Sequence, residues 1–249
     1  MNVNHMTKTL LITGASGGIG AAAAILAAQN GWRVAVHYHT NHAQALNVCN
    51  TIIKNGGQAQ AFKADLTIES EIEQLFKQVG DLHGLVNNVG ITPLIARVDE
   101  MTAERLNTIF NTNITSAFLC AGHAIKAMST RYGHAGGVMV NVSSRAAVLG
   151  SAHRYIDYAA SKAALDTLTI GLAKELALES IRVNTVRAGM IDTPIHDKNN
   201  GKNDLARIQS TIPMQRIGTA DEVAQAIVWL LSDAASYCTG TFIDVAGGR

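Results

Sequence analysis

The chain is predicted to adopt an α/β fold built on a parallel, doubly wound sheet of seven strands flanked by helices. Short runs rich in β-branched residues alternate with longer stretches of helical periodicity along all 249 residues. This alternation is typical of parallel strands joined by right-handed crossovers. Only three prolines occur, and no linker rich in proline, glycine or serine divides the chain, so we expect a single domain over residues 1–249.

The individual elements follow from apolar runs and from the residues that end them. Strands are expected at 9–13, 34–38, 58–63, 85–87, 137–142, 181–186 and 241–245. Helices are expected at 21–29, 43–54, 70–79, 103–128, 155–179 and, after a capping box formed by Thr219 and Glu222, up to Leu231. The stretch at about 190–218 has no clear strand and follows a strand end, so it is predicted to be a substrate lid.

Composition excludes several classes of protein. Twenty basic and nineteen acidic residues give a net charge of +1, which does not favour a nucleic-acid partner. The N-terminus lacks the apolar core of a signal peptide, and no apolar run is long enough to span a membrane. The three cysteines are far apart and form no CxxC pair, which indicates free thiols. We therefore expect a cytoplasmic protein.

A glycine-rich segment, Thr13 to Gly20 (TGASGGIG), joins the first strand to the first helix. Glycines at this point permit a tight turn and let the backbone approach a pyrophosphate, which the N-terminus of the helix then binds. The spacing of Gly14, Gly18 and Gly20 is GxxxGxG and differs from the usual GxGxxG. The segment predicts a dinucleotide site.

The end of the second strand bears on which dinucleotide binds. NAD-binding proteins usually carry an acid there, and that acid would repel a 2′-phosphate. Here the strand continues as His37-Tyr38-His39-Thr40-Asn41 without any acid, which favours NADP(H) over NAD(H). His37, His39 and His42 form no metal-ligand pattern, because no cysteine or acid lies near them, and no metal site is expected.

Tyr158 and Lys162 lie four residues apart, and on a helix this spacing places them on one face. A lysine ammonium near a phenol favours the phenolate and lowers the pKa of the tyrosine, so that Tyr158 could exchange protons near neutral pH. Chance pairs at this spacing are common on helices. Polar residues that end two other strands, Asn87-Asn88 and Ser143-Ser144, are placed to line the same crevice.

Together these motifs resemble those of the short-chain dehydrogenase/reductase family: TGxxxGxG at 13–20, NNxG at 87–90, a serine at 144 and YxxxK at 158–162. The resemblance covers nearly the whole chain and implies a Rossmann-type fold. It implies an NADP(H)-dependent oxidoreductase that interconverts a carbonyl and a secondary alcohol.

The resemblance also implies roles for single residues. Tyr158 would be the general acid/base, Lys162 would bind the nicotinamide ribose, Ser144 would position the substrate oxygen, and Asn113 would hold a proton-relay water. Asp65 would contact the adenine ring and Thr193 the carboxamide. The full set of cofactor-binding residues would be Gly14, Ser16, Gly18, Ile19, Gly20, His39, Thr40, Asp65, Leu66, Asn88, Gly90, Tyr158, Lys162, Gly189, Ile191 and Thr193.

The chain departs from the family pattern at three places. Ala188-Gly189 stands where Pro-Gly is usual, Val89 stands where alanine is usual, and an extra residue between serine and tyrosine leaves Ser143 as an alternative to Ser144. Two other functions stay open: a non-catalytic dinucleotide-binding sensor or scaffold, and an epimerase or dehydratase, which would need a longer C-terminal domain.

The substrate is not identified by the sequence beyond a small-molecule carbonyl or alcohol. Candidates for the substrate wall are Ile91, Pro93, Leu94, Ala146, Val148, Leu149, His153, Arg154 and Met190. The family resemblance further implies a homotetramer.

Overall fold

The computed structural model describes residues 8–193 and 209–249. Its centre is one seven-stranded sheet in the order β3-β2-β1-β4-β5-β6-β7. The strands are β1 (Thr9–Ile12), β2 (Arg33–Tyr38), β3 (Gln58–Lys63), β4 (Gly84–Asn87), β5 (Gly137–Ser144), β6 (Ile181–Ala188) and β7 (Phe242–Val245). Every neighbouring pair is parallel, which confirms the predicted fold class.

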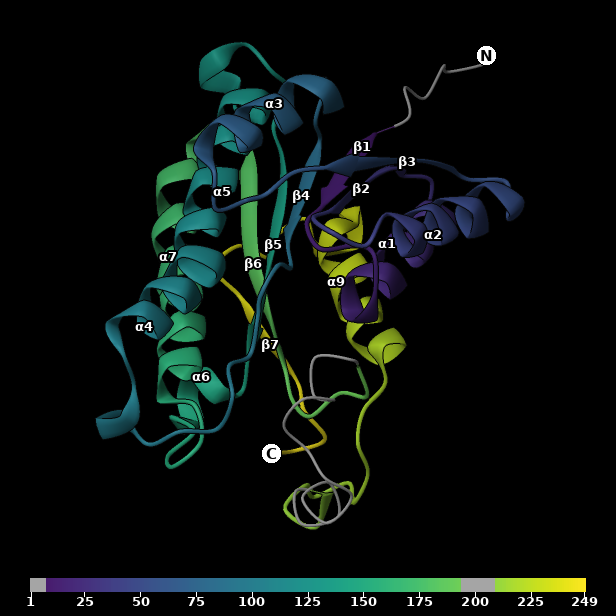
Figure 1. Ribbon diagram of the computed structural model, residues 1–249. Coiled ribbons are helices and arrows are strands. Elements are labelled where there is room, and N and C mark those ends of the chain that lie inside the picture. The colour runs from purple at the N-terminus through teal and green to yellow at the C-terminus, as the bar shows by residue number, and fades with distance from the viewer. Residues whose placement is uncertain (1–7, 194–208) are drawn as a thin grey trace, which may run out of the picture.

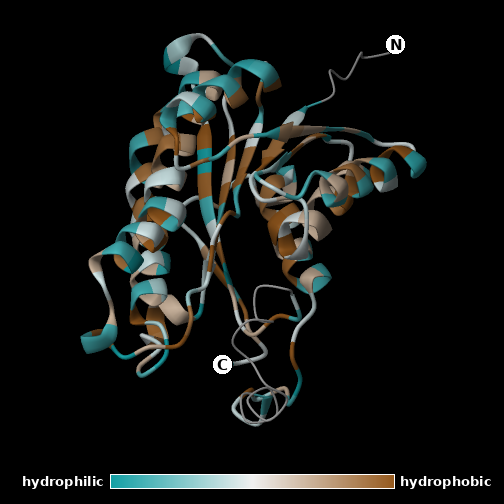
Figure 2. Ribbon diagram, viewed as in Figure 1, coloured by the Kyte–Doolittle hydropathy of each residue, from teal (hydrophilic) through white to brown (hydrophobic). Residues whose placement is uncertain are grey.

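Helices cover both faces of the sheet (Figure 1). They are α1 (Gly18–Gln29), α2 (His42–Lys54), α3 (Glu69–Val79), α4 (Ala103–Phe110), α5 (Ser116–Met128), α6 (Ala146–Leu149), α7 (Ile156–Leu176) and α9 (Ala220–Leu231). One apolar core joins the sheet to α1, α2 and α9, and a second joins it to α3, α5 and α7. Figure 2 shows the hydrophobic residues turned towards the strands on both sides. Burial of these two cores is the main force that fixes the layered arrangement.

The helix expected at 103–128 is interrupted. Asn111–Thr115 forms a π-helical turn between α4 and α5, and this turn is where Asn113 lies. Such turns insert an extra residue into an α-helix and are frequent at functional sites. The short helix α6 was not expected, and β5 and β6 each extend two residues beyond the predicted ends. The capping box of α9 is confirmed, because Thr219 Oγ1 accepts from Glu222 N at 3.3 Å and Glu222 Oε2 accepts from Thr219 N at 2.8 Å.

The residues on either side of the central part of the predicted lid are joined by backbone hydrogen bonds. Residues 194–208 lie outside the described residues, but Ile191 and Gly218 on either side of them form a parallel β-bridge. The following turn is tied to the C-terminus, since Met214 N donates to Gly247 O at 3.1 Å. In residues 8–193 and 209–249, no helix has the length and apolar character needed to cross a membrane. All three cysteines are free, with Cys49 and Cys120 buried.

Candidate active site

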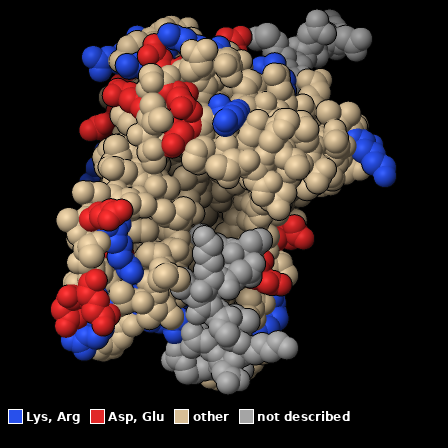
Figure 3. Space-filling view, in the orientation of Figure 1, with Lys and Arg blue, Asp and Glu red and all other residues tan. Residues whose placement is uncertain are grey.

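The carboxyl ends of β1, β4, β5 and β6 meet at one edge of the sheet, where the strand order reverses between β1 and β4. A cavity of about 740 Å³ opens there. Figure 3 shows a hollow in the middle of this face, with tan walls and with charged side chains towards the margins. One side of the cavity, which we call the cofactor end, is lined by the glycine-rich loop, Gln44, Asn88 and Thr193. The other side, which we call the substrate end, is lined by residues of the segment from Ser144 to Tyr158.

The glycine-rich loop has the geometry of an anion cradle. Gly14 adopts φ 64° and Gly18 φ 54°, which is the left-handed region that favours glycine. A Cβ on Gly20 would overlap the carbonyl oxygen of Gly14, so the helix can approach the loop this closely only without a side chain. Gly17 caps α1 without a side-chain hydrogen bond, and the first turn has no acid. The free N–H groups and the positive end of the helix dipole therefore fit the pyrophosphate of a dinucleotide.

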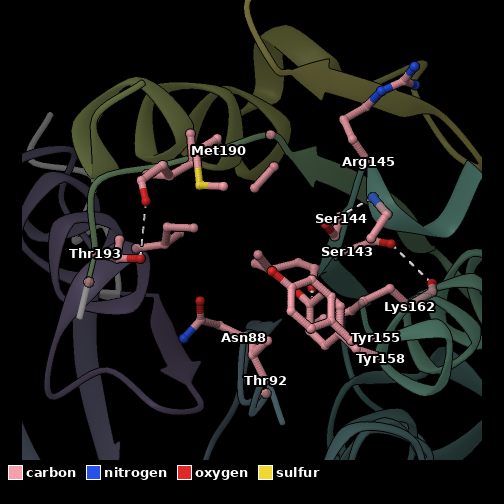
Figure 4. A pocket seen from close by; sticks show the side chains of 18 of the residues that line it. Asn88, Thr92, Ser143, Ser144, Arg145, Tyr155, Tyr158, Lys162, Met190 and Thr193 are labelled. Atoms are coloured by element: carbon pink, nitrogen blue, oxygen red, sulfur yellow. Dashed lines mark hydrogen bonds between the residues drawn. The ribbon is translucent and has the colours of Figure 1, made fainter. Parts of the chain in front are cut away.

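The candidate catalytic residues come from β5 and α7 and meet at the substrate end. Figure 4 shows Tyr158 and Tyr155 projecting into the cavity, with Ser143 and Ser144 beside them. Lys162 lies behind Tyr158, with Nζ 5.8 Å from the centre of the phenol ring and donating to Val142 O at 2.8 Å. Ser144 Oγ accepts from Ala146 N at 3.1 Å, whereas Ser143 Oγ is buried and donates to Lys162 O at 3.0 Å. The Ser143 hydroxyl is therefore bound to the backbone, and Ser144 is the serine whose hydroxyl lies at Tyr158.

Comparison with known proteins agrees with this geometry. The family model described as enoyl-(acyl carrier protein) reductase matches residues 14–249. An oxidoreductase of Escherichia coli (strain K12), YgfF, is 50% identical over 96% of this chain and 98% of its own. A 3-oxoacyl-[acyl-carrier-protein] reductase of Synechocystis is 36% identical over 97% of this chain and 96% of its own. A mutant short-chain dehydrogenase/reductase of Serratia marcescens superposes with a TM-score of 0.89 at 29% identity, covering 97% of both chains.

The chain belongs to the short-chain dehydrogenase/reductase family. Members of this family are oxidoreductases that use a nicotinamide dinucleotide, and the cradle described above fits that cofactor. Of the residues that the sequence assigned to the cofactor, those that line the main cavity are Gly14, Ser16, Gly18, Ile19, Asn88, Gly90, Tyr158, Lys162, Gly189, Ile191 and Thr193. Gly20, His39, Thr40, Asp65 and Leu66 do not line it, and of these His39 and Thr40 line a second cavity described below.

The pKa of Tyr158 departs from the sequence-based expectation. Burial raises this pKa to about 12, although the Ser144 hydroxyl acts in the opposite direction. The Lys162 ammonium, which donates to the Val142 carbonyl, does not offset this effect of burial. Burial also lowers the pKa of Lys162 to about 8, against the opposing charge of Asp166. With this pKa, Tyr158 is a neutral phenol at neutral pH.

Asn113 is fully buried in the π-helical turn and does not line the cavity. Its Oδ1 accepts from Ile91 N at 2.8 Å, and its Nδ2 donates to Ile91 O and to Ser161 Oγ, both at 3.0 Å. The amide thus ties the loop after β4 to the helix that carries Tyr158. Its three hydrogen bonds to protein atoms give the side chain a structural task besides the water-holding role that the resemblance implies.

His37 proves to be a structural residue of the cofactor end. Gly14 N donates to its Nδ1 at 3.0 Å, so Nε2 carries the proton and donates to Ala64 O at 3.0 Å. Ala15 N also donates to His37 O at 2.9 Å. Burial lowers the pKa of His37 to about 4, and the ring is neutral in the folded protein. One imidazole therefore joins the glycine-rich loop to the ends of β2 and β3.

Thr13 and Asn88 complete this bracing. Asn88 Nδ2 donates to Thr13 O at 2.9 Å and to Gly14 O at 3.1 Å, while Asn88 N donates to Thr13 Oγ1 at 2.9 Å. Asn88 therefore holds the end of β4 against the glycine-rich loop. Thr193 packs over the same loop, within 3.4 Å of the position that a Cβ of Gly18 would take.

A second cavity, of about 430 Å³, lies beyond the end of β2. It is lined by Tyr38, His39, Thr40, His42 and Lys63. His39 Nε2 lies 3.5 Å from Asp65 Oδ2, and Asp65 Oδ1 accepts from both N and Oγ1 of Thr67. Hydrogen bonds from Thr67 hold the pKa of Asp65 below its usual value. Lys63 was missed in the sequence, since its place beside Tyr38 depends on the pairing of β2 with β3.

Several lining residues carried no motif. Gln44, Thr92, Tyr155, Thr211 and Arg249 come from five separate segments and meet only in the folded chain. Of the expected substrate wall, Ala146, Leu149, Arg154 and Met190 line the cavity, whereas Ile91, Pro93, Leu94, Val148 and His153 do not.

Proposed function

We propose that this oxidoreductase interconverts a carbonyl compound and a secondary alcohol with NADP(H), and that Tyr158 is its general acid/base. The observation that carries the proposal is the meeting of the Tyr158 and Ser144 side chains at a cavity whose other end fits a dinucleotide. The nicotinamide ring of the bound cofactor would supply the hydride that reaches the carbonyl carbon.

The roles of the protein residues follow from their positions. A neutral Tyr158 can donate its proton to the carbonyl oxygen as negative charge develops there. The Ser144 hydroxyl would donate a hydrogen bond to the same oxygen. The Lys162 ammonium behind the ring would stabilise the phenolate that remains, and the reverse reaction would use that phenolate as the base.

Replacement of Tyr158 by phenylalanine tests the acid/base role. We expect Tyr158→Phe to lower kcat on the order of a thousandfold, because the proton donor is lost. The dissociation constant for NADPH should change less than about threefold, since the ring remains. Tyr132→Phe, on an exposed tyrosine far from the cavity, is the matched control. Carbonyl reduction by Tyr158→Phe at a near-normal rate would refute the proposed role.

The preference for NADP(H) is supported by the second cavity. Its lining supplies the imidazoles of His39 and His42, the hydroxyl of Thr40 and the ammonium of Lys63. Asp65, whose carboxylate lies 3.5 Å from His39, does not line it. Donors and a cation of this kind suit a 2′-phosphate better than they suit a bare ribose hydroxyl.

Replacement of Lys63 by glutamine tests this preference. Lys63→Gln should raise the dissociation constant for NADPH by about tenfold, equivalent to ~1.4 kcal/mol, and should leave that for NADH within about twofold. Lys54→Gln, on an exposed lysine that ends α2, is the control. Titration of intrinsic fluorescence gives both constants, and tighter binding of NADH than NADPH by the unaltered protein would reject the preference.

A homotetramer in the cytoplasm remains part of the proposal. The outer faces of α5 and α7 carry the exposed apolar side chains of Phe118 and Ile170, which a partner subunit would cover. Light scattering that gives the mass of one chain would exclude the oligomer.

A further inference from the structure

Four charged side chains of alternating sign lie beside the strand and the helix that carry the candidate catalytic residues. They are Asp166 on α7, Arg187 on β6, Asp244 on β7 and Arg145 directly after β5. Arg187 Nε donates to Asp166 Oδ2 at 2.8 Å, and Arg187 Nη1 lies 3.8 Å from Asp244 Oδ1. Arg145 forms an ion pair with the other oxygen of Asp244. The proposed function gives this row of charges no task.

Arg187 is fixed at the centre of the row. Its guanidinium carbon lies 4.1 Å from the centre of the Phe242 ring, and in the sheet Arg187 stands between Ser143 on β5 and Asp244 on β7. The side chains of Arg187 and Asp166 are 17% and 10% exposed, so water screens their ion pair little. Burial raises the pKa of Asp166, and the Arg187 guanidinium acts in the opposite direction. The ion pair therefore favours an ionised carboxylate at neutral pH.

Asp166 lies one helical turn after Lys162 on α7, and this spacing places both buried side chains on the same face of the helix. Asp166 Oδ2 binds Arg187, whereas Oδ1 is buried and accepts no hydrogen bond from the described residues. The nearby Ser143 hydroxyl donates to Lys162 O instead. A buried carboxylate oxygen without a donor is costly, and such groups are found at functional sites. Here its negative charge lies beside a buried ammonium.

The other groups around Lys162 are neutral. Its Nζ donates to a backbone carbonyl of β5 and lies 3.0 Å from the position that a Cβ of Gly90 would take, with the Asn113 amide next to Gly90. The Tyr158 ring, 5.8 Å away, is a neutral phenol. Burial lowers the pKa of Lys162, and the charge of Asp166 acts in the opposite direction. Among the described residues, Asp166 is therefore the charge that favours the ammonium.

We propose that Asp166 is a positioning residue of the reaction, because its carboxylate, fixed by Arg187, keeps the Lys162 side chain charged beside Tyr158. This inference rests on the proposed function and adds a residue to it. The ammonium stabilises the Tyr158 phenolate only while it is protonated. Without the carboxylate, burial would remove the charge of Lys162 at a lower pH.

The pH dependence of carbonyl reduction tests the proposal on the full-length enzyme with NADPH and the best substrate from a panel of ketones and aldehydes. For the unaltered enzyme, kcat/KM should fall as the pH rises through the pKa of Lys162, which is about 8. In Asp166→Asn the midpoint of this fall should lie at least about one pH unit lower, because an opposite charge one helical turn away is lost. At pH 9 this variant should be about tenfold slower than the unaltered enzyme, and at pH 6 the two should agree within about threefold.

Further variants separate charge from packing. Asp166→Glu keeps the charge and should restore the midpoint, whatever its effect on the maximum of kcat/KM. Glu175→Gln, which removes an exposed acid from the same helix, is the matched control and should leave the profile unchanged. If Asp166→Asn fails to fold because Arg187 is left buried without its partner, the double variant Asp166→Asn, Arg187→Met removes both charges. It should show the same lower midpoint, since Lys162 again lacks the carboxylate.

NMR of protein labelled with ¹³C at lysine Cε gives the pKa of Lys162 without any substrate, and Lys162→Arg assigns the signal. The pKa in Asp166→Asn should lie at least about one unit below that of the unaltered protein. This measurement distinguishes the two ways in which the proposal can fail. Carbonyl reduction with the same midpoint and the same Lys162 pKa in both proteins overturns the role of Asp166, because a structural loss alone lowers kcat/KM equally at every pH. Absence of any carbonyl reduction although NADPH binds refutes the proposed function itself, whatever the pKa of Lys162.

Discussion

Gly14 occupies the left-handed backbone region at the cofactor end of the cavity, whereas Ser151 and His153 occupy the same region at the substrate end. Glycine enters this region without strain, and the other two residues do not. The glycine-rich loop is also held by buried hydrogen bonds from His37 and Asn88. The turn from Gly150 to Tyr155 is more exposed and is tied by backbone bonds and aromatic contacts.

This difference matches the two ligands that the ends would hold. The dinucleotide is the same in every turnover, and a relaxed, firmly braced loop suits it. The substrate distinguishes one oxidoreductase from another, and the strained turn places particular side chains on the wall. Changes at the cofactor end should therefore weaken binding and stability, whereas relief of strain at the substrate end should raise stability and reduce selectivity.

The largest effect on stability is expected from low pH, through His37, which holds the glycine-rich loop. His37 has a pKa of about 4 in the folded protein and about 6.5 when unfolded, so between these values only the unfolded chain takes up this proton. Stability should fall as the pH drops from 6.5 to 4, by about 3 kcal/mol from this group, and His37 should add no further change below pH 4.

Urea unfolding at pH 7.5 and at pH 4.5 measures this fall. The His37→Asn protein cannot take up the proton. Its free energy of unfolding should therefore fall less between these two pH values, and the difference should be most of the ~3 kcal/mol. Carboxylates away from position 37, such as Glu222 with its lowered pKa, contribute equally to both proteins and cancel in the comparison. Parallel pH profiles of stability for the two proteins would show that folding does not lower the pKa of His37.

A smaller effect is expected when the two hydrogen bonds of His37 are separated. An asparagine places its Oδ1 where Nδ1 lies and can still accept from Gly14 N, whereas a glutamine reaches the Ala64 carbonyl instead. We expect His37→Gln to weaken NADPH binding about tenfold, since the Gly14 N–H loses its buried acceptor. His37→Asn should weaken it by less than about threefold, which calorimetric titration can resolve. Equal losses in both variants would indicate general packing rather than the bond to Gly14.

The smallest effect concerns the strained turn. His153→Gly should leave the free energy of unfolding unchanged or raise it by at most about 1 kcal/mol. Relief of the φ 61° conformation is offset by the greater freedom of glycine in the unfolded chain. The same change should reduce selectivity among carbonyl substrates, since Tyr155, which follows this turn on the cavity wall, would be held less firmly. Gly14→Ala is the counterpart at the cofactor end and should lower stability, because it creates the strain that His153→Gly removes. A stable His153→Gly enzyme with undiminished selectivity would mean that the strain has no part in recognition.

Much of the architecture was predictable because it depends on local patterns. Alternating strands and helices, the glycine-rich loop and the capping box of Thr219 each lie within a few residues, and the structure confirms the predicted sheet. The π-helical turn at Asn111–Thr115 was not predictable, because it depends on contacts of Asn113 with Ile91 and Ser161, which lie far from it in the sequence.

The sequence by itself determined the family, the alternation of strands and helices along the chain, and the segments that supply Tyr158, Lys162 and the glycine-rich loop. Only the tertiary structure decided that His37 braces Gly14, that Lys63 lies beside His39, and that burial raises the pKa of Tyr158 although Lys162 is close. The physical reason is that motifs record neighbours along the chain, whereas burial, hydrogen bonds and pKa values depend on residues that become neighbours only on folding.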